Sequence, residues 1–184
     1  MTSELLTIDG RTGEGGGQVL RTALSLSVAL GRPVRVTHVR GKREKPGLLR
    51  QHLTALRAAA EISGGTAVGE LSGAEAELRP GPVRAGDYEF RIGSAGSTLL
   101  VLQTVLSPLL LADGPSTLLL EGGTHNPLAP PFEFVARAFA PLLARLGARL
   151  AFELVRPGFH PAGGGVLRAH ITPPEPALPL ELLE

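Results

Sequence analysis

Short apolar runs that suit β-strands alternate along the chain with longer runs whose apolar residues recur every three or four positions. This alternation is typical of an α/β fold. In the first half, the pattern predicts strands at residues 5–9 and 34–39, helices at 18–30 and 47–62, and short strands at 66–71 and 75–79. In the second half, it predicts strands at 88–92 and 117–121, helices at 97–112 and 132–146, and strands at 148–155 and 166–171. Both halves therefore carry the same order of elements.

An internal repeat accompanies this order. Residues 19–25 (VLRTALS) match residues 101–107 (VLQTVLS) at five of seven positions, at an offset of 82. The same offset pairs Pro33 with Pro115, Gly41 with Gly123 and Gly65 with Gly147. Leucine-rich segments also match by chance, but a proline and several glycines in one register favour two copies of a βαβαββ unit. We expect the copies at residues 1–84 and 85–172, and a proline-rich linker at 173–184.

Composition narrows the class of protein. Hydrophobic residues make up 43% of the 184 residues and charged residues 19%, which excludes wholesale disorder. The chain has no cysteine, so it has no disulfide and no thiolate nucleophile. Its formal charge of +1 requires any nucleic-acid contact to be a local patch. The acidic start lacks the features of a secretion signal, and the apolar run 99–112 is too short to span a bilayer. We therefore expect a cytoplasmic protein without a membrane partner.

The first candidate for chemistry is GEGGGQ at residues 13–18, between a predicted strand and a predicted helix. Glycines let backbone amides turn toward a ligand, and a helix N-terminus favours phosphate. The spacing fits neither the dinucleotide nor the P-loop motif, so a plain tight turn is the alternative. Glu14 would repel phosphate unless a cation such as Mg²⁺ bridged the two, or it is an exposed or capping residue.

Cationic side chains follow the glycine segment. Arg21 lies one turn into an apolar helix, where it either points back to the loop as a phosphate ligand or extends from a packed helix to solvent. Residues 38–57 hold six lysines and arginines, among them Arg40 and Arg43, against one glutamate. Such a run is either a solvated surface or, at the end of a strand, a site for polyphosphate or RNA phosphate.

Several less charged residues complete the candidates. Gln51 is expected to be exposed, and His52 to lie at the edge of the core. Gln103 occupies the repeat position of Arg21 and, if buried, needs a partner, because an unpaired buried amide costs about 1–3 kcal/mol. Pro130 and Phe134 offer flat apolar surface for a base or for the core. The segment GFHPAGGGVL at residues 158–167 suits a hairpin or a bulge.

Five blocks together resemble the RNA 3'-terminal phosphate cyclase family: DGRTGEGGGQVLRTALSLS, RGKREKPGLLRQHLTAL, IGSAGSTLLVLQTVL, GGTHNPLAPP and GFHPAGGGV. The resemblance extends over residues 6–171. It implies repeated βαβαββ units, similar to those of enolpyruvyl transferases, with a small inserted domain. It also implies a reaction in which ATP adenylates a histidine, AMP passes to an RNA 3'-phosphate, and the neighbouring 2'-hydroxyl displaces AMP to leave a 2',3'-cyclic phosphate.

The resemblance also implies roles for individual residues. Glu14 would hold a divalent metal, Mg²⁺ or Mn²⁺, at the ATP phosphates, and Arg21, Arg40 and Arg43 would bind ATP or RNA phosphates. Gln51 and His52 would line the same cleft on the substrate side. Gln103 would contact ATP, while Pro130 and Phe134 would pack against adenine. Pro157 stands where the family usually has Arg or His, and His125 stands where an Asp is familiar.

The family's adenylated histidine lies in a last repeat beyond the inserted domain, and none of the five histidines here matches its motif. We therefore expect the first two repeats of a cyclase, without the third repeat and the insert, as a truncated or split enzyme that is inactive by itself. A second chain would then supply the C-terminal half. The alternatives are a non-catalytic cyclase-like protein in RNA binding or ribosome assembly, and a small-molecule transferase with a related fold.

Overall fold

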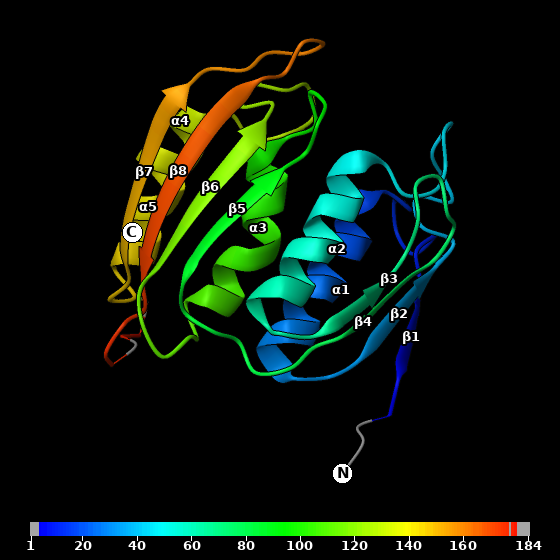
Figure 1. Ribbon diagram of the computed structural model, residues 1–184, viewed down its shortest axis with the longest axis horizontal. Helices are drawn as coiled ribbons and strands as arrows, with labels where there is room; N and C mark the ends of the chain where they lie inside the picture. The colour runs from blue at the N-terminus through cyan, green and yellow to red at the C-terminus, as the bar shows by residue number, and fades with distance from the viewer. Residues whose placement is uncertain (1–3, 177, 180–184) are drawn as a thin grey trace.

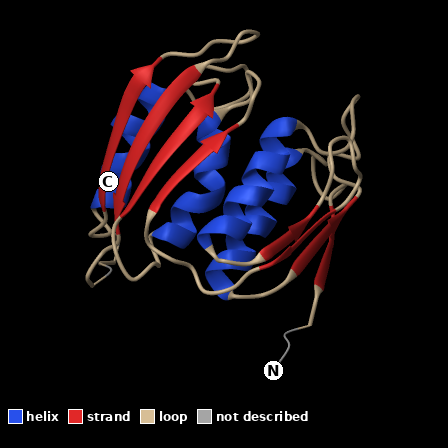
Figure 2. Cartoon of the chain, in the orientation of Figure 1, coloured by secondary structure: helices blue, strands red, loops and turns tan. Residues whose placement is uncertain are grey.

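Two four-stranded sheets form the outer layers of the molecule, and helices fill the space between them (Figure 1, Figure 2). The structure is a computed structural model, and it describes residues 4–176 and 178–179. The first sheet belongs to the N-terminal half of the chain and the second to the C-terminal half, so each sheet is built from one continuous stretch of sequence.

The first unit runs from β1 to β4. Its elements are β1 (Leu6–Asp9), α1 (Gly17–Leu30), β2 (Val34–Thr37), α2 (Arg50–Ile62), β3 (Thr66–Val68) and β4 (Ala76–Arg79). The strand order is β1-β2-β4-β3, with β1 parallel to β2 and the other two pairs antiparallel. A parallel pair needs a crossover connection, which α1 supplies.

The second unit repeats this topology. Its elements are β5 (Asp87–Arg91), α3 (Thr98–Leu109), β6 (Ser116–Gly122), the consecutive helical segments α4 (Phe132–Phe134), η1 (Val135–Phe139) and α5 (Ala140–Ala144), and strands β7 (Arg149–Arg156) and β8 (Gly165–Thr172). The order β5-β6-β8-β7 has the same parallel and antiparallel pairs as the first sheet. The fold class is therefore confirmed as α/β with two tandem βαβαββ repeats.

The offset of 82 residues also relates the helices of the two units. It carries residues 50–62 of α2 onto 132–144, the span of α4, η1 and α5. The boundaries at residues 84 and 172 stay predictions. The expected linker at 173–184 is described only in part: Leu178 donates its backbone N–H to Leu146 O at 2.9 Å, and residues 177 and 180–184 lie outside the described residues.

The core lies where α1, α2 and α3 pack together and against the two sheets. Its largest fully buried side chains are all leucine or isoleucine, which suits a chain with few aromatic residues: Leu20, Leu24, Leu48, Leu56, Ile62, Leu78, Leu102, Leu109, Leu118, Leu120, Leu167 and Ile171. Each such side chain contributes about 1.5–3 kcal/mol on burial. None of the helices described is long and apolar enough to cross a membrane.

Several predicted boundaries differ from the structure, such as the helix expected at 97–112, which ends at Leu109. The helix expected from residue 47 begins at Arg50, because Gly47 has a positive φ of 86° and Leu48 donates its N–H to Gly73 O instead. The strand expected at 66–71 ends at Val68, since the following residues turn back to contact Leu48. The helix expected to continue to residue 146 ends at Ala144 and contains the π-helical segment η1.

Candidate functional site

Three adjoining cavities lie between the two units, at the carboxyl ends of the parallel strands. Loops that follow β1, β2, β5 and β6 form their walls. Ligands of open α/β folds gather at this edge of a sheet, because the connecting loops meet there. The site therefore depends on both repeats.

The cavities differ in chemistry. The aromatic cavity, of about 420 Å³, is lined by Pro130, Phe134, Phe139 and Gln103 among others. The glycine-loop cavity, of about 790 Å³, is lined by residues 12–19 together with Arg21, Arg40, Arg43, Gln51 and His52. The repeat-junction cavity, of about 930 Å³, is lined by residues that include Arg50, Gln51, Leu71, Ser94, Asn126 and His160. All nine residues selected from the sequence line the first two cavities.

Shared residues connect the three cavities. Gln18 and Arg21 line both the aromatic and the glycine-loop cavity. Leu49 and Gln51 line both the glycine-loop and the repeat-junction cavity. Leu100 and Leu128 line all three, so the cavities meet at these two side chains.

The backbone of the glycine loop, residues 13–17, packs directly against side chains of α2 and of the basic loop, which connects β2 to α2. A Cβ added at Gly16 would lie 2.7 Å from Arg43 Nη2, and one at Gly17 would lie 2.4 Å from His52 Nε2. Any other residue would therefore push these groups away. The loop leads into α1, whose first turn offers unpaired backbone N–H groups that suit an anion.

Glu14 and the basic loop close over this segment. The Glu14 carboxylate, with 90% of its side chain exposed, contacts Arg43 Nη2 at 3.2 Å. Lys42 Nζ donates to Gly13 O at 2.8 Å. Arg40 donates through Nη1 to the carbonyls of Lys45 and Gly47, which fixes its guanidinium within its own loop. Burial, with the nearby charge of Arg43, lowers the pKa of Arg40.

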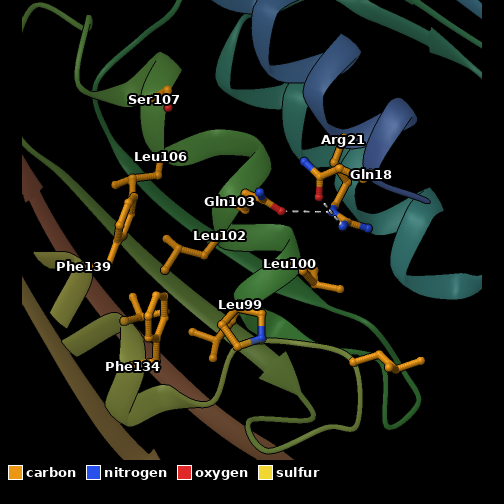
Figure 3. Close-up of a pocket in the computed structure, with 13 residues that line it drawn as sticks. Gln18, Arg21, Leu99, Leu100, Leu102, Gln103, Leu106, Ser107, Phe134 and Phe139 are labelled. Carbon is orange, nitrogen blue, oxygen red and sulfur yellow. Dashed lines mark hydrogen bonds between the residues drawn. The ribbon is translucent and has the colours of Figure 1, made fainter. Parts of the chain in front are cut away.

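Arg21 is a buried cation. Only 8% of this residue is exposed, and burial lowers its pKa to about 10, so it is still protonated at neutral pH. Its Nε donates to Gln103 Oε1 at 3.1 Å and its Nη2 to Gln18 Oε1 at 2.8 Å. No carboxylate of the described residues pairs with it. Of the two roles left open by the sequence, the solvent-directed one is wrong, because the guanidinium stays between α1 and α3 (Figure 3).

His52 is buried on α2 and presents a neutral imidazole to the glycine loop. Leu49 donates its backbone N–H to Nδ1 at 3.1 Å, so Nδ1 carries the lone pair and Nε2 carries the proton. Burial, and the positive charges of Arg21 and Arg40, lower its pKa to about 3. The ring is therefore a neutral hydrogen-bond donor beside Gly17. His52 is buried in the core and not at its edge, where the sequence analysis placed it.

The prediction that Gln51 is exposed is wrong. Gln51 is half-buried, because its Oε1 accepts the backbone N–H of Ser97 at 3.0 Å and so joins α2 to the second repeat. Gln103 is exposed on the wall of the aromatic cavity. Its Oε1 nevertheless has a partner, because it accepts the hydrogen bond from Arg21 Nε.

The aromatic cavity has one apolar wall and, opposite it, one polar wall. Figure 3 shows Phe134 and Phe139 on the wall opposite Arg21, Gln18 and Gln103. Phe134 is 53% exposed, so it does not anchor the core. Phe134 and Phe139 are five residues apart, and the π-helical segment η1 between them brings both to the cavity. Such segments occur often at functional sites.

Several lining residues are missing from the sequence prediction, and three of them show why. Phe139 shares the wall of the aromatic cavity with Phe134, but α-helical periodicity does not place them together. Leu128, with a positive φ of 61°, borders all three cavities, and no sequence pattern indicates this. Gln18 ends the quoted glycine segment and lies three residues before Arg21, a helical spacing that could have indicated their contact.

The segment at residues 158–167 connects β7 to β8 as a hairpin loop, as one sequence interpretation suggested. A Cβ at Gly158 would lie 2.2 Å from Gly165 N, so the backbones approach too closely for another residue. Thr124 donates its N–H to Gly158 O at 2.8 Å, which ties the hairpin to the loop after β6. His125 stacks on Phe159, with ring centroids 5.0 Å apart, and contacts Glu133 at 3.0 Å.

Among the residues that the structure describes, no group of three or more His, Asp or Glu side chains could hold a metal ion by itself. Glu14 is therefore the single carboxylate at the glycine loop. A metal ion at this position would need most of its ligands from a bound molecule or from water.

The sequence matches the family model described as RNA 3'-terminal phosphate cyclase over residues 12–181. Proteins named "RNA 3'-terminal phosphate cyclase" from Ralstonia nicotianae, Ectopseudomonas mendocina and Koribacter versatilis are 56%, 55% and 53% identical to it over 169, 174 and 181 residues. These alignments cover 91%, 94% and 98% of this chain. The chain belongs to the RNA 3'-terminal phosphate cyclase family. It covers 49%, 50% and 51% of the three relatives, so it spans about half their length.

Proposed function

We propose that this chain carries the ATP site and the 3'-phosphate site of an ATP-dependent RNA 3'-terminal phosphate cyclase. The complete enzyme would convert an RNA 3'-phosphate into a 2',3'-cyclic phosphate. The observation that carries the proposal is the buried guanidinium of Arg21, which lacks a carboxylate partner among the described residues and borders both the aromatic and the glycine-loop cavity. A buried charge is costly unless it is paired, and a phosphate would supply the missing charge.

ATP fits the two cavities by chemistry. The base would lie in the aromatic cavity against Pro130 and Phe134, with the Gln103 amide at its edge. The triphosphate would lie along the glycine loop, where Arg21, Arg40 and Arg43 line the wall. Aromatic faces bind a base by stacking, and fixed guanidinium groups bind phosphate oxygens in pairs.

A divalent metal fits the same place. Mg²⁺ commonly binds through one or two carboxylates and the oxygens of a substrate phosphate, with water filling the remaining positions. Glu14 supplies one exposed carboxylate on the wall of the glycine-loop cavity, where the phosphates would lie. When bound, Mg²⁺ or Mn²⁺ would neutralise phosphate charge, and ATP would supply the adenylyl group.

The side chains of this chain would bind and orient the two substrates. Arg43 would exchange Glu14 for phosphate oxygens, so that the ion pair opens as the ligand enters. His52 would donate its Nε2 proton to a phosphate oxygen, without changing its own charge. Gln51 would hold the Ser97 loop in place on the RNA side.

The reaction implied by the family also needs a histidine that accepts AMP, and we do not assign it to any of the five histidines here. His52 is least suited, because its lone pair on Nδ1 is already used by Leu49. We expect the chain alone to form no covalent AMP adduct with radiolabelled ATP and Mg²⁺. An adduct band that survives denaturation would contradict this part of the proposal.

Titration calorimetry of the chain with ATP and Mg²⁺ tests the site. We expect saturable binding, and a loss of about tenfold or more in Arg21→Ala, since one charge-assisted hydrogen bond contributes about 1.5–3 kcal/mol. Arg57→Ala is the matched control, because Arg57 is an exposed arginine of α2 that lines none of the three cavities. Absence of ATP binding, or equal losses in both variants, would refute the proposal.

A further inference from the structure

We infer that His125 is a positioning residue for the base of ATP, which holds Phe134 in place by joining Glu133 to the hairpin loop between β7 and β8. This inference rests on the proposed function. His125 and Glu133 line none of the three cavities, so they act through Phe134 and not by contact with the nucleotide. Pro130, which lines the aromatic cavity together with Phe134, lies between the two residues of the pair in the chain.

The segment that carries Phe134 has few buried contacts to fix it. It follows β6 and leads into α4 and η1. None of the residues 125–134 is buried, and Leu128 among them is fully exposed. Phe132 is half-buried against the core. Segments with few buried apolar contacts open easily unless other contacts hold them, so polar contacts matter here.

His125 is held from three directions. Its Nδ1 lies 2.8 Å from Thr124 Oγ1, and its ring stacks on Phe159 with the two planes inclined by 22°. Its Nε2 contacts the two carboxylate oxygens of Glu133 at 3.0 and 3.3 Å. Thr124 is buried, and its Oγ1 accepts the backbone N–H of Gly158 at 2.9 Å. The imidazole therefore connects Glu133 to the hairpin loop through both of its nitrogens and one face.

The contact with Glu133 exists in both charge states of the ring. A carboxylate only accepts, so Nε2 of His125 carries a proton and donates it. The hydrogen bond from its own backbone N–H, with the contact to His125 and the charge of Arg137, holds the pKa of Glu133 below its ordinary value. Nδ1 accepts from the Thr124 hydroxyl when the ring is neutral and donates to it when the ring is charged.

The direction of Phe134 follows from that of Glu133. The two residues are consecutive in one helical segment, so their side chains leave it about 100° apart. With Glu133 held toward the hairpin loop, Phe134 lies on the wall of the aromatic cavity, as Figure 3 shows. Loss of the pair would free this wall and leave Arg21 and the glycine loop unchanged. The expected signature is weaker binding of the base without weaker binding of the phosphates.

Titration calorimetry with two ligands tests the pair: ATP with Mg²⁺, and inorganic tripolyphosphate, which has no base. His125→Phe keeps a flat ring beside Phe159 but cannot donate to Glu133. We expect it to weaken ATP binding by about fivefold and to leave tripolyphosphate binding unchanged. His125→Gln should restore most of the ATP affinity, because the side-chain amide can donate to Glu133. His170→Phe is the matched control, since His170 is exposed on β8 and lines none of the three cavities.

A double-mutant cycle on ATP affinity tests whether the two residues act together. Glu133 is exposed, so Glu133→Ala should leave the fold intact, which urea denaturation checks. We expect Glu133→Ala to weaken ATP binding about as much as His125→Phe does. The double variant should bind no more weakly than either single variant, because each substitution removes the same contact.

The outcomes separate the two proposals. If the unmodified chain does not bind ATP, the proposed function fails, and the inference fails with it. If it binds ATP, but His125→Phe weakens both ligands equally or neither, or the losses of the two single variants multiply in the double variant, the positioning role is overturned and the ATP site stands. A loss confined to ATP, restored by His125→Gln and not deepened in the double variant, supports the positioning role.

Discussion

Arg21 Nε donates a hydrogen bond to Gln103 Oε1 at 3.1 Å, and these residues stand 82 positions apart, at equivalent positions of the two repeats. Equivalent residues of two copies touch only when they lie close to the axis that relates the copies. The duplication therefore brings one polar side chain from α1 and one from α3 together between the sheets. One copy has a guanidinium and the other an amide, so the pair has a net positive charge beside the aromatic cavity.

The buried charge of Arg21 should lower the free energy of unfolding, and this effect can be measured. Replacement of a buried, incompletely paired charge by an apolar side chain of similar length is often stabilising. We expect Arg21→Met to raise the free energy of unfolding by about 1–2 kcal/mol while it weakens ATP binding by about tenfold or more. Gln18 and Gln103 are exposed, so water can replace the lost guanidinium. Urea denaturation without ligand measures the change, and a destabilised variant would show that Arg21 serves the fold instead.

Stability should also depend on the protonation of His52. Its pKa is about 3 in the folded chain and near 6.5 when unfolded, so between these values the unfolded state binds one more proton. The free energy of unfolding should therefore fall as the pH drops below 6.5, by at most about 1.4 kcal/mol per pH unit, with no contribution above it.

His52→Gln isolates this effect, because glutamine keeps a donor and an acceptor but does not titrate. Urea denaturation at a series of pH values should show a flatter dependence between pH 6.5 and pH 4 than the unmodified chain has. The control, His170→Gln, removes an exposed histidine of β8 and shows what the loss of any histidine does. An unchanged slope in His52→Gln would mean that the buried ring is not the source.

Most of the fold could be predicted from the sequence, because the apolar pattern and the offset of 82 residues reflect local rules. The strands, most of the helices and the two βαβαββ units followed from them. The ends of elements did not, since contacts from distant segments decide them. Leu48, for example, bonds to Gly73 instead of extending α2, and the π-helical segment η1 depends on packing that no periodicity encodes.

The candidate site was predicted less completely from the sequence than the fold was. Charged and glycine-rich segments indicated Glu14, Arg21, Arg40 and Arg43, because such residues have few structural reasons to cluster. The exposure of Gln51 was misjudged, and the contact of Gln103 with Arg21 was not foreseen, since each amide takes its partner from the other repeat. Phe139 was missed because its neighbour on the cavity wall lies five residues away and not three or four.

The close approach at Gly17 predicts an unusual sensitivity to one methyl group. Alanine is normally favourable in a helix, but here its Cβ would lie 2.4 Å from His52 Nε2, and His52 is buried. We expect Gly17→Ala to lower the free energy of unfolding by about 1–3 kcal/mol and to weaken ATP binding. Gly114→Ala is the control, because the nearest atom would be Ala85 Cβ at 3.4 Å. Thermal unfolding measures the stability of both variants, and equal stabilities would contradict the expectation.

Glu14 should affect ATP binding with opposite signs in the presence and absence of metal. Without Mg²⁺, its carboxylate repels the phosphates and competes for Arg43, so Glu14→Gln should tighten ATP binding. With Mg²⁺, the same substitution removes a ligand and should weaken it. Stability should change little, because an exposed ion pair contributes little. Calorimetry with Mg²⁺ and with a chelator measures the change in ATP affinity under each condition. A change in the same direction under both conditions would exclude a metal role for Glu14.

Substitution of the two phenylalanines of the aromatic cavity should weaken binding of the base and leave binding of the phosphates unchanged. Phe134 and Phe139 lie on the side of the aromatic cavity opposite Arg21, and neither of them lines the glycine-loop cavity. We expect Phe134→Ala and Phe139→Ala each to weaken ATP binding by about 1–3 kcal/mol, the usual contribution of stacking on a base. Binding of inorganic tripolyphosphate, which has no base, should be unchanged in both variants and reduced in Arg21→Ala. If Phe139→Ala binds ATP as well as the unmodified chain does while Phe134→Ala does not, the π-helical segment places only one aromatic wall against the base.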